Sequence, residues 1–262
     1  MKFSIIGTGF IVPRHIEAIN FVGGKIIDVV NDAYGKNIWQ KMVKNTKADC
    51  IVILTPNDLH FKMCQTAAEA GKTVLCEKPL AIRSEHIKKL AKYKNIFTVL
   101  QLRRHPLIEA IKSEIKNKKN HKIEIDVSVY RDKEYYTSWK GQEKRSGGVL
   151  FNLGIHYFDL LLYLFGSAQA IKTLSVNDKT GTGIIKGRNY ICDWRVSTDE
   201  KQDKQRRIFK INGENYNFSS QDNLSYENLH RFVYQDLLKK KGISPKQALR
   251  SVELVERLHD SA

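Results

Sequence analysis

The sequence contains no run of about 20 consecutive apolar residues, which is the length that a membrane-spanning helix needs. Its first residues, MKFSIIGTGF, hold a hydrophobic run that is too short for a signal peptide and that enters a glycine turn at once. From these absences we expect no membrane partner and a cytoplasmic location.

Cysteine is also scarce, and its spacing is not that of a metal site. The chain has 4 cysteines, at Cys50, Cys64, Cys76 and Cys192. Three of them lie in an apolar or helical context, which is typical of buried, reduced thiols in a cytosolic protein. We therefore expect no metal ion.

Acidic residues are few relative to basic ones, with 28 Asp and Glu against 44 Lys and Arg, and the net charge is +16. Such a charge can indicate nucleic-acid binding. The lysines are spread along the chain, however, and the densest runs, at 116–122 and 239–241, lie at expected helix ends. We therefore expect no nucleic-acid partner but a positive field that favours an anionic small substrate.

The first segment has the pattern of a dinucleotide-binding unit. A strand over 2–6 leads into Gly7-x-Gly9, and a helix is expected over 13–21. Glycines let the backbone approach a pyrophosphate, and the helix N-terminus faces its negative charge. Val12 stands where a third glycine is usual, so an ordinary strand–helix turn remains an alternative. The residues expected to bind the cofactor here are Gly7, Gly9, Phe10 and Ile11.

The next strand, over 25–30, ends in Asn31 and Asp32. An acidic residue about 20 positions after the glycines usually holds the adenosine ribose hydroxyls. A carboxylate there repels the extra phosphate of NADP, so we expect NAD.

A strand and a helix of the complete fold are missing. Only one helical segment, 36–45, separates strand 25–30 from the apolar strand 50–54. In the strand order 3-2-1-4-5-6 the third strand is an edge, so its loss leaves the buried strands paired. We predict a shortened Rossmann sheet with strand 25–30 as its free edge.

Polar residues follow the later strands at the sheet edge where ligands bind. Thr55-Pro56-Asn57 follows strand 50–54, and Glu77-Lys78-Pro79 follows strand 73–76. A helix over 84–93 and a strand over 97–100 complete the unit. We therefore predict a cofactor domain over residues 1–104 and a substrate domain over residues 105–262.

The second domain is expected to be α+β with an open mixed or antiparallel sheet. Its expected strands are 122–130, 169–177, 183–187, 190–197, 206–211 and 214–218, and its expected helices are 106–116, 225–239 and 244–259. An aromatic and cationic connection over 131–145 precedes its central helix.

That central helix, within SGGVLFNLGIHYFDLLLYLFG at 146–166, is apolar except for one stripe. Asn152, His156, Asp159 and Tyr163 fall at helical spacing and share a face. A buried polar stripe must meet partners or a ligand. The helix is therefore either a core helix with a satisfied histidine or the wall of an active site.

Together these motifs resemble the glucose–fructose oxidoreductase/inositol dehydrogenase (Gfo/Idh/MocA) family. The resemblance implies an N-terminal Rossmann domain, a C-terminal α/β domain with an open sheet, and NAD(P)-linked oxidoreduction of a sugar or polyol. It also implies a cis Lys78–Pro79 bond and a homo-oligomer, often a tetramer formed through the open sheet. The motifs are Gly7-x-Gly9, Thr55-Pro56-Asn57 with His60, Glu77-Lys78-Pro79, and Gly147-Gly148 followed by Asn152, Gly154, His156 and Asp159.

A narrower group within the family is similar in further segments. QLRRHP at 101–106, SWKG at 138–141 and FNLGIHYFD at 151–159 resemble the UDP-N-acetylglucosaminuronate 3-dehydrogenases. This resemblance implies oxidation of the 3-hydroxyl of a UDP-sugar acid to a ketone, in the synthesis of surface polysaccharides.

The resemblance also implies roles for single residues. An amide cannot accept a proton, so Asn152 is expected to orient the sugar. Either Lys78 or His156 then takes the proton of the reacting hydroxyl. The catalytic candidates are therefore Lys78, His156 and Asn152.

Other polar residues are expected to contact the cofactor or the substrate. Glu77 is expected near the nicotinamide ribose, and cationic side chains suit a carboxylate or diphosphate. The remaining cofactor candidates are Thr55, Asn57, His60, Lys78 and Gln101. The substrate candidates are Lys78, Arg103, Arg131, Trp139, Lys140, Lys144, Asn152 and His156.

Two alternatives stay open. Val12, Asn31 and the missing strand could loosen the adenosine end of the site, which would leave a non-catalytic protein that binds a nucleotide sugar. Another sugar or polyol dehydrogenase of the same family is the second alternative.

Overall fold

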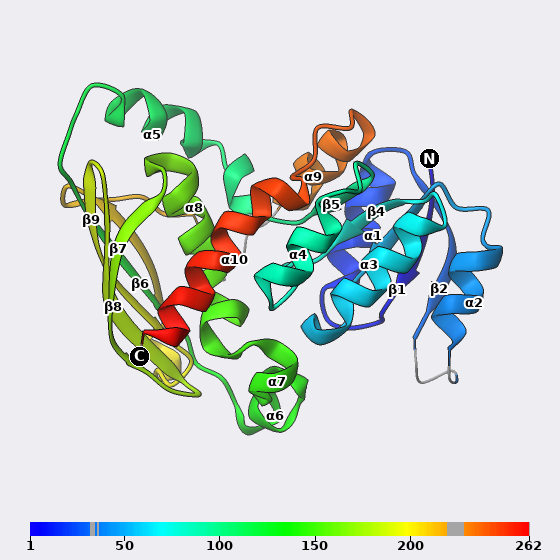
Figure 1. Ribbon diagram of the computed structural model, residues 1–262, viewed down its shortest axis with the longest axis horizontal. Coiled ribbons are helices and arrows are strands. Elements are labelled where there is room, and N and C mark those ends of the chain that lie inside the picture. The colour runs from blue at the N-terminus through cyan, green and yellow to red at the C-terminus, as the bar shows by residue number, and fades with distance from the viewer. Residues whose placement is uncertain (32–34, 36, 219–227, 262) are drawn as a thin grey trace. The chain divides into compact units, whose positions relative to one another are not determined.

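The structure, a computed structural model, describes residues 1–31, 35, 37–218 and 228–261. Asp32 and the first residues of the helices expected over 36–45 and 225–239 lie outside the described residues. The chain forms two compact units, each made of two stretches of sequence (Figure 1). The first unit is Met1–Leu100 with Asn228–Leu249, and the second is Gln101–Glu227 with Arg250–Ala262.

The first unit contains a parallel sheet of five strands in the order β2-β1-β3-β4-β5. The predicted shortened Rossmann sheet is therefore confirmed, with β2 at its edge. The strands are β1 Lys2–Ile6, β2 Lys25–Val30, β3 Cys50–Ile53, β4 Thr73–Cys76 and β5 Ile96–Thr98. The helices are α1 Val12–Phe21, α2 Ile38–Asn45, α3 His60–Glu69, α4 Ser84–Leu90 and α9 Leu229–Leu238, with a short 3-10 turn at Asn57–Leu59.

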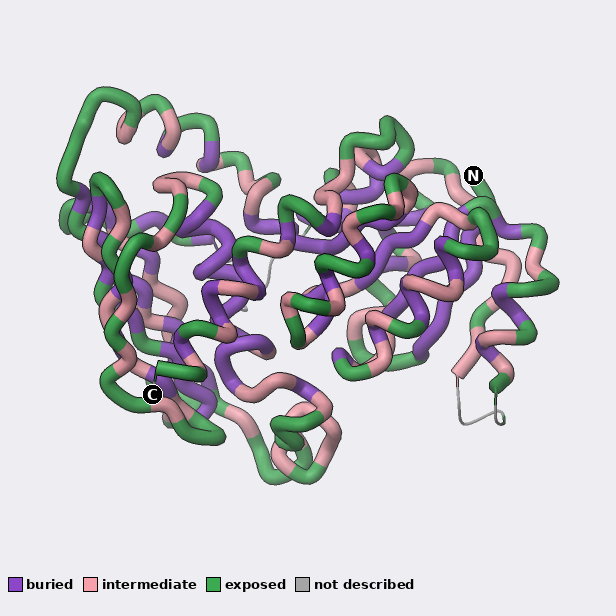
Figure 2. Tube along the Cα trace, viewed as in Figure 1, coloured by how far each residue is buried: buried purple, intermediate pink, exposed green. Residues whose placement is uncertain are grey.

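Burial explains why these segments become strands. All four residues of β3 are buried, as expected for an apolar run in the middle of a parallel sheet. The edge strand β2 is only partly buried, and Val29 is 43% exposed. The strands alternate their side chains between two helix-covered faces, and Figure 2 shows this sheet as largely buried.

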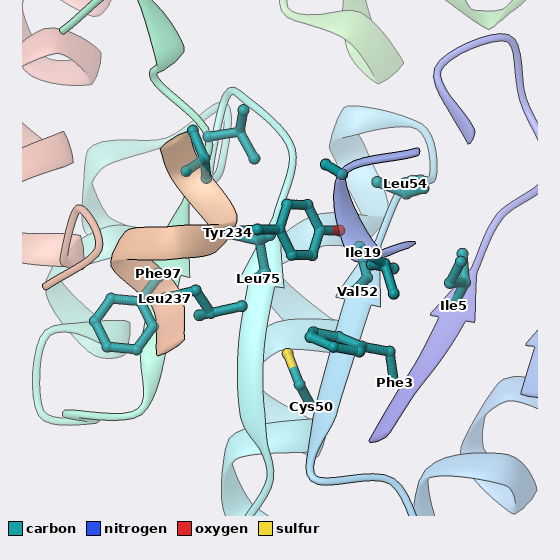
Figure 3. Packing of buried hydrophobic residues seen from close by; sticks show 13 residues of the cluster. Phe3, Ile5, Ile19, Cys50, Val52, Leu54, Leu75, Phe97, Tyr234 and Leu237 are labelled. Carbon is teal, nitrogen blue, oxygen red and sulfur yellow. The ribbon is translucent and has the colours of Figure 1, made fainter. Parts of the chain in front are cut away.

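One face of the sheet is covered by α1 together with α9, a helix from far along the chain. Ile19 of α1 and Tyr234 and Leu237 of α9 belong to one core cluster with Phe3 and Val52 of the strands (Figure 3). Residues 228–249 therefore belong to the first unit, although a single division of the chain after residue 104 assigns them to the second domain. The apolar face of α9 is completed by strands more than a hundred residues away, so local sequence could not assign it.

The second unit contains a mixed sheet of six strands in the order β11-β10-β6-β9-β8-β7, in which β6 and β9 are parallel and the other neighbours antiparallel. The predicted mixed sheet is confirmed. Its strands are β6 His121–Ser128, β7 Ala168–Val176, β8 Thr180–Gly187, β9 Tyr190–Ser197, β10 Arg206–Ile211 and β11 Glu214–Asn215. Its helices are α5 Leu107–Ile115, α6 Lys133–Thr137, α7 Glu143–Ser146 and α8 Ile155–Phe165, and α10 Pro245–Asp260 extends into it from the first unit.

The central helix packs its apolar residues on this sheet. The ring of Phe158 lies 5.3 Å, edge to face, from that of Trp194 on β9. The sequence predicts one regular helix here, but Leu150–Gly154 forms a π-helical turn before α8 begins. A side chain at Gly154 would meet Phe158 at 2.7 Å and Val196 at 3.2 Å, so glycine permits the close approach of this turn to the sheet.

By length and composition alone, the helical stretch Glu143–Phe165 could cross a membrane. Within the structure, however, 78% of its most apolar window is buried, and buried core helices have the same composition. The stretch is therefore weak evidence for a membrane segment.

The turn after β1 generates a stability prediction. Gly7 has φ +107°, and a Cβ there would lie 2.5 Å from the carbonyl oxygen of Leu54, whereas no heavy atom lies within 4 Å of a Cβ at Gly9. We expect Gly7→Ala to lower the free energy of unfolding by about 2–4 kcal/mol and Gly9→Ala to change it by about 0.5 kcal/mol or less. Urea denaturation of both variants measures this, and equal losses would contradict the close approach at Gly7.

Candidate functional site

The glycine turn is built to admit a ligand next to the backbone. The Gly7 N–H donates to the Val30 carbonyl at 2.8 Å, which fixes the end of β1 beside the end of β2. Gly9 is exposed, and the space that its missing side chain leaves is open. A phosphate group can therefore approach this backbone closely.

The start of α1 lies next to that space in the chain, but its first N–H groups already have acceptors: Val12 donates to the Gly9 carbonyl and Arg14 to the Ile11 carbonyl, each at 3.1 Å. Ile11 is the N-cap residue and makes no side-chain capping bond, and a proline stands in the first helical turn. What the helix start offers an anion is the partial positive charge at the N-terminal end of the helix dipole. The turn and the helix start therefore fit the pyrophosphate of a dinucleotide. Phe10, beside them, is 75% exposed.

The end of β2 is tied to this turn. The Asn31 amide donates to the Thr8 hydroxyl at 2.6 Å. Asn31 therefore fixes the loop where the adenosine ribose is expected, while Asp32 lies outside the described residues.

His60, a cofactor candidate, is completely buried and has a structural role. Its Nδ1 lies 2.6 Å from the Pro79 carbonyl oxygen and its Nε2 lies 2.9 Å from the Thr55 carbonyl oxygen. Burial lowers the pKa of the ring, although both backbone contacts oppose that shift. His60 thus links the turns that follow β3 and β4, and the predicted cis Lys78–Pro79 bond is confirmed. Contact between His60 and a cofactor stays a prediction, as it does for Thr55 and Asn57.

Glu77 turns its carboxylate toward two histidines that the sequence analysis missed. Its Oε1 lies 3.0 Å from His15 Nε2 on α1 and 3.4 Å from His230 Nε2 on α9, and its Oε2 accepts the Lys78 N–H at 3.1 Å. Burial alone raises the Glu77 pKa, but the hydrogen bonds from both histidines hold it well below its usual range. The carboxylate is therefore an anion engaged within the first unit, and its contact with a ribose stays a prediction.

A sequence signal for His15 does exist. Ile11, His15 and Ile19 fall four residues apart, so the histidine lies on the apolar stripe of α1. Burial lowers the pKa of His15, so the ring is disposed to be neutral. For His230 no local signal reveals the partner, because Glu77 is 153 residues away.

In the second unit, the polar stripe of α8 does find partners. Asp159 accepts two hydrogen bonds from Arg103, at 2.7 and 2.6 Å, and a third from the Ser251 hydroxyl at 2.7 Å. The Tyr163 hydroxyl accepts from Lys112 at 2.9 Å. Arg103 is expected to bind the substrate. In the structure two of its nitrogens bind a buried carboxylate, because a charge buried that deeply needs a counterion.

Half-buried cations gather around Tyr135 in the second unit. The Arg131 guanidinium lies 5.4 Å and the Lys140 ammonium 5.9 Å from the centre of its ring. Burial lowers the pKa of both cations, and repulsion from Arg131 lowers that of Lys140 further. Asn152 joins them, because its amide donates to the Lys140 carbonyl at 2.9 Å. Positive charge disfavoured in this way is suited to an anionic ligand.

Arg207 on β10 is a further member of this group that sequence reasoning missed. Its charge also lowers the pKa of Arg131. It pairs with the buried Val127 and lies on the same face of β10 as the buried Phe209 and Ile211, which indicates the helix-covered face of the sheet. The period of two along the predicted strand 206–211, which places Arg207 on the face of Phe209 and Ile211, is the signal that could have identified it.

The other predicted residues are less informative. Trp139 is half-buried in a 3-10 turn, and Lys144 is exposed on α7. Gln101 and His156 are 5% and 6% exposed, both in the second unit. Lys78 belongs to the first unit, so the joint action of Lys78 and His156 stays a prediction.

Comparison with protein families gives two matches along the chain. Residues 26–96 match an oxidoreductase family with an NAD-binding Rossmann fold. Residues 112–181 match the C-terminal alpha/beta domain of an oxidoreductase family of the same name. The matches fall in the two predicted domains and in the predicted order.

The curated relatives include sugar and polyol dehydrogenases. Levoglucosan dehydrogenase of Pseudarthrobacter phenanthrenivorans is 31% identical over 147 residues, 52% of this chain and 38% of that protein. Inositol 2-dehydrogenase of Rhizobium meliloti is 26% identical over 184 residues, 63% of this chain and 55% of that protein. The chain thus spans about half the length of the curated relatives that it matches.

A solved structure is similar along almost the whole chain. It is the WlbA (WbpB) dehydrogenase of Thermus thermophilus in complex with NAD and UDP-GlcNAcA. The TM-score is 0.86 at 27% identity, and the alignment covers 98% of this chain and 94% of that chain.

The Arg103–Asp159 pair generates a second stability prediction. The two side chains are 11% and 2% exposed, so removing one partner leaves a buried charge. We expect Asp159→Ala to lower the free energy of unfolding by about 3–5 kcal/mol. Glu109→Ala, which breaks the exposed pair with Lys112, should change it by about 0.5 kcal/mol or less. Chemical denaturation compares the two, and a small loss for Asp159→Ala would contradict the structural role of the pair.

The buried histidines generate a pH prediction. Burial lowers the pKa values of His15 and His60 in the folded chain. The unfolded chain therefore binds more protons below about pH 6.5, and each histidine costs up to about 1.4 kcal/mol of stability per pH unit there. We expect the free energy of unfolding to fall between about pH 7.5 and about pH 5.5, and His60→Gln to weaken that dependence. Stability that rises toward the lower pH would refute this.

Proposed function

We propose, from the premise that this chain belongs to the Gfo/Idh/MocA oxidoreductase family, that it is an NAD-dependent dehydrogenase of a UDP-sugar acid. The reaction is oxidation of the 3-hydroxyl of UDP-N-acetylglucosaminuronate to a ketone, in the synthesis of surface polysaccharides. The observation that carries this proposal is the group of half-buried cations around Tyr135.

The cofactor assignment is supported by the first unit. Its open glycine turn and the positive end of the α1 dipole fit a pyrophosphate, and its family is described as NAD-binding. When bound, NAD would accept the hydride, and the protein supplies position and proton transfer.

The substrate assignment is supported by electrostatics. A UDP-sugar acid carries a carboxylate and a diphosphate, and these anions would relieve the unfavourable charge at Arg131 and Lys140. A neutral polyol would not. The Thermus dehydrogenase with UDP-GlcNAcA, at 27% identity, supports the same choice.

The polar residues then have distinct tasks. Asn152 orients the sugar, and its amide is itself oriented by the bond to the Lys140 carbonyl. Either Lys78 or His156 takes the proton of the 3-hydroxyl as the hydride leaves the carbon. A neutral imidazole and a neutral amine can each accept this proton.

A second candidate is a dehydrogenase of a free sugar or polyol. Two curated relatives are named levoglucosan dehydrogenase and inositol 2-dehydrogenase, and these names favour it. In either case we propose a homo-oligomer, because Leu174 of β7 is 59% exposed on the sheet of the second unit and a second chain could cover it. We also propose a cytoplasmic location.

The experiment is a coupled assay of purified protein with NAD and UDP-N-acetylglucosaminuronate, with inositol and levoglucosan as competing substrates. An acceptor that consumes NADH keeps the reaction moving. We expect turnover with the sugar nucleotide, and a loss of about 10²–10⁴-fold in kcat for whichever of Lys78→Met and His156→Asn removes the base.

Cation variants test the substrate class. Arg131→Met and Lys140→Met should raise KM for the sugar nucleotide and leave KM for NAD unchanged, while Lys116→Met, at an exposed lysine after α5, serves as the control. Turnover of inositol in preference to the sugar nucleotide would favour the second candidate. Binding of the sugar nucleotide without NADH formation from any of the three substrates would contradict both proposed dehydrogenase activities.

A further inference from the structure

Lys78 lies in a turn whose two neighbouring residues are both held by buried histidines. Glu77 precedes it and Pro79 follows it, across the cis bond. Of the three histidines involved, His15 and His60 are 0% exposed and His230 is 2% exposed.

On the N-terminal side, two histidine rings converge on one carboxylate oxygen. His15 and His230 approach Glu77 Oε1 from different helices, and their rings lie edge to face with centroids 4.9 Å apart. The other carboxylate oxygen accepts the N–H of Lys78 itself. The backbone of Lys78 is therefore fixed through Glu77.

The His15 ring is in turn oriented by Tyr234 of α9. Its Nδ1 lies 2.8 Å from the Tyr234 hydroxyl, which is completely buried. If the hydroxyl donates to Nδ1, the ring carries its proton on Nε2 and donates it to Glu77. Every polar atom along Tyr234, His15 and Glu77 is then paired.

On the C-terminal side, His60 fixes the other end of the turn. It lies between the Pro79 and Thr55 carbonyl oxygens, at 2.6 and 2.9 Å. A neutral ring carries one N–H, so it donates to one of the two carbonyls at a time.

We propose that His15, His60 and His230 are positioning residues that clamp the Lys78 turn from both sides. The inference rests on the proposed function, in which Lys78 acts on the substrate. A lysine side chain has many rotamers, so its ammonium can be placed accurately only if its backbone is fixed. A misplacement of about 1 Å at a reacting group can cost about 100-fold in rate.

The same three side chains on the N-terminal side could ligate a metal ion. The ligand atoms of His15, Glu77 and His230 lie within 4.8 Å of one another, and two histidines with a carboxylate suit zinc. The 3.0 Å between His15 and Glu77 is, however, the distance of a hydrogen bond from an N–H group, and the 3.4 Å between His230 and Glu77 is that of a longer, weaker one. The cluster is complete without an ion, so the hydrogen-bonded clamp is the inference that the contacts support.

The test compares His230→Leu, which removes the donor, with His230→Gln, which keeps one. His15→Leu and His15→Gln form a second pair in case one substitution prevents folding. We expect the leucine variants to lower kcat about 10–100-fold while the Kd for NAD changes less than about twofold, and the glutamine variants to regain part of kcat. His86→Leu, on the surface of α4, is the control.

A second readout does not depend on activity. Amide hydrogen exchange at Lys78, whose N–H is bonded to Glu77, should accelerate in the leucine variants while exchange at Val52 in the core stays unchanged. If wild-type protein has no turnover, the proposed function fails but exchange still tests the clamp. Unchanged exchange at Lys78, a kcat loss matched by loss of NAD affinity, or stoichiometric metal in the purified protein would each overturn it.

Discussion

The first unit depends on one buried anion, the carboxylate of Glu77. A carboxylate buried without donors is strongly unfavourable, and this one receives hydrogen bonds from His15, His230 and the Lys78 backbone. Those donors come from α1, α9 and the turn after β4, so one charge joins three separate parts of the unit. Satisfying it requires a helix from near the end of the chain, and α9 accordingly packs beside α1.

A comparable constraint operates in the second unit, with a different solution. Asp159 is buried in α8, and its charge is balanced by a bidentate arginine and a serine hydroxyl. Asp159 therefore has a structural role within the polar stripe of α8. Asn152 lies near the other end of the stripe, beside Lys140 and the cations around Tyr135. This helical segment is thus both a core element and one side of the group of cations around Tyr135.

Local pattern predicted most of the fold, because strands and helices follow from apolar runs, glycine turns and period. The missing strand was visible as a missing segment, and the edge position of β2 followed from strand order. Contacts across long separations were not predictable: α9 with α1, and Glu77 with His230. The π turn at Leu150–Gly154 was also missed, since the spacing of apolar residues does not distinguish a π-helical turn, with its i→i+5 hydrogen bonds, from an α-helical one. The bond of Arg103 to Asp159 was not foreseen, because a buried counterion and a ligand-binding arginine look alike in sequence, and its contact with a substrate stays a prediction.

The shortened sheet raises the question of what stabilises its exposed edge. Asp28 of β2 accepts the Ser4 hydroxyl of β1 at 2.7 Å and the Thr46 hydroxyl, just after α2, at 2.5 Å. These bonds hold β2 from the side chains as well as through its ladder with β1, so the edge needs no further strand beyond it. Asn31 then leaves β2 in a fixed direction and reaches Thr8. Short side-chain hydrogen bonds therefore hold the end of β2 and the glycine turn in place. In a longer sheet, a neighbouring strand would stabilise β2 in their stead.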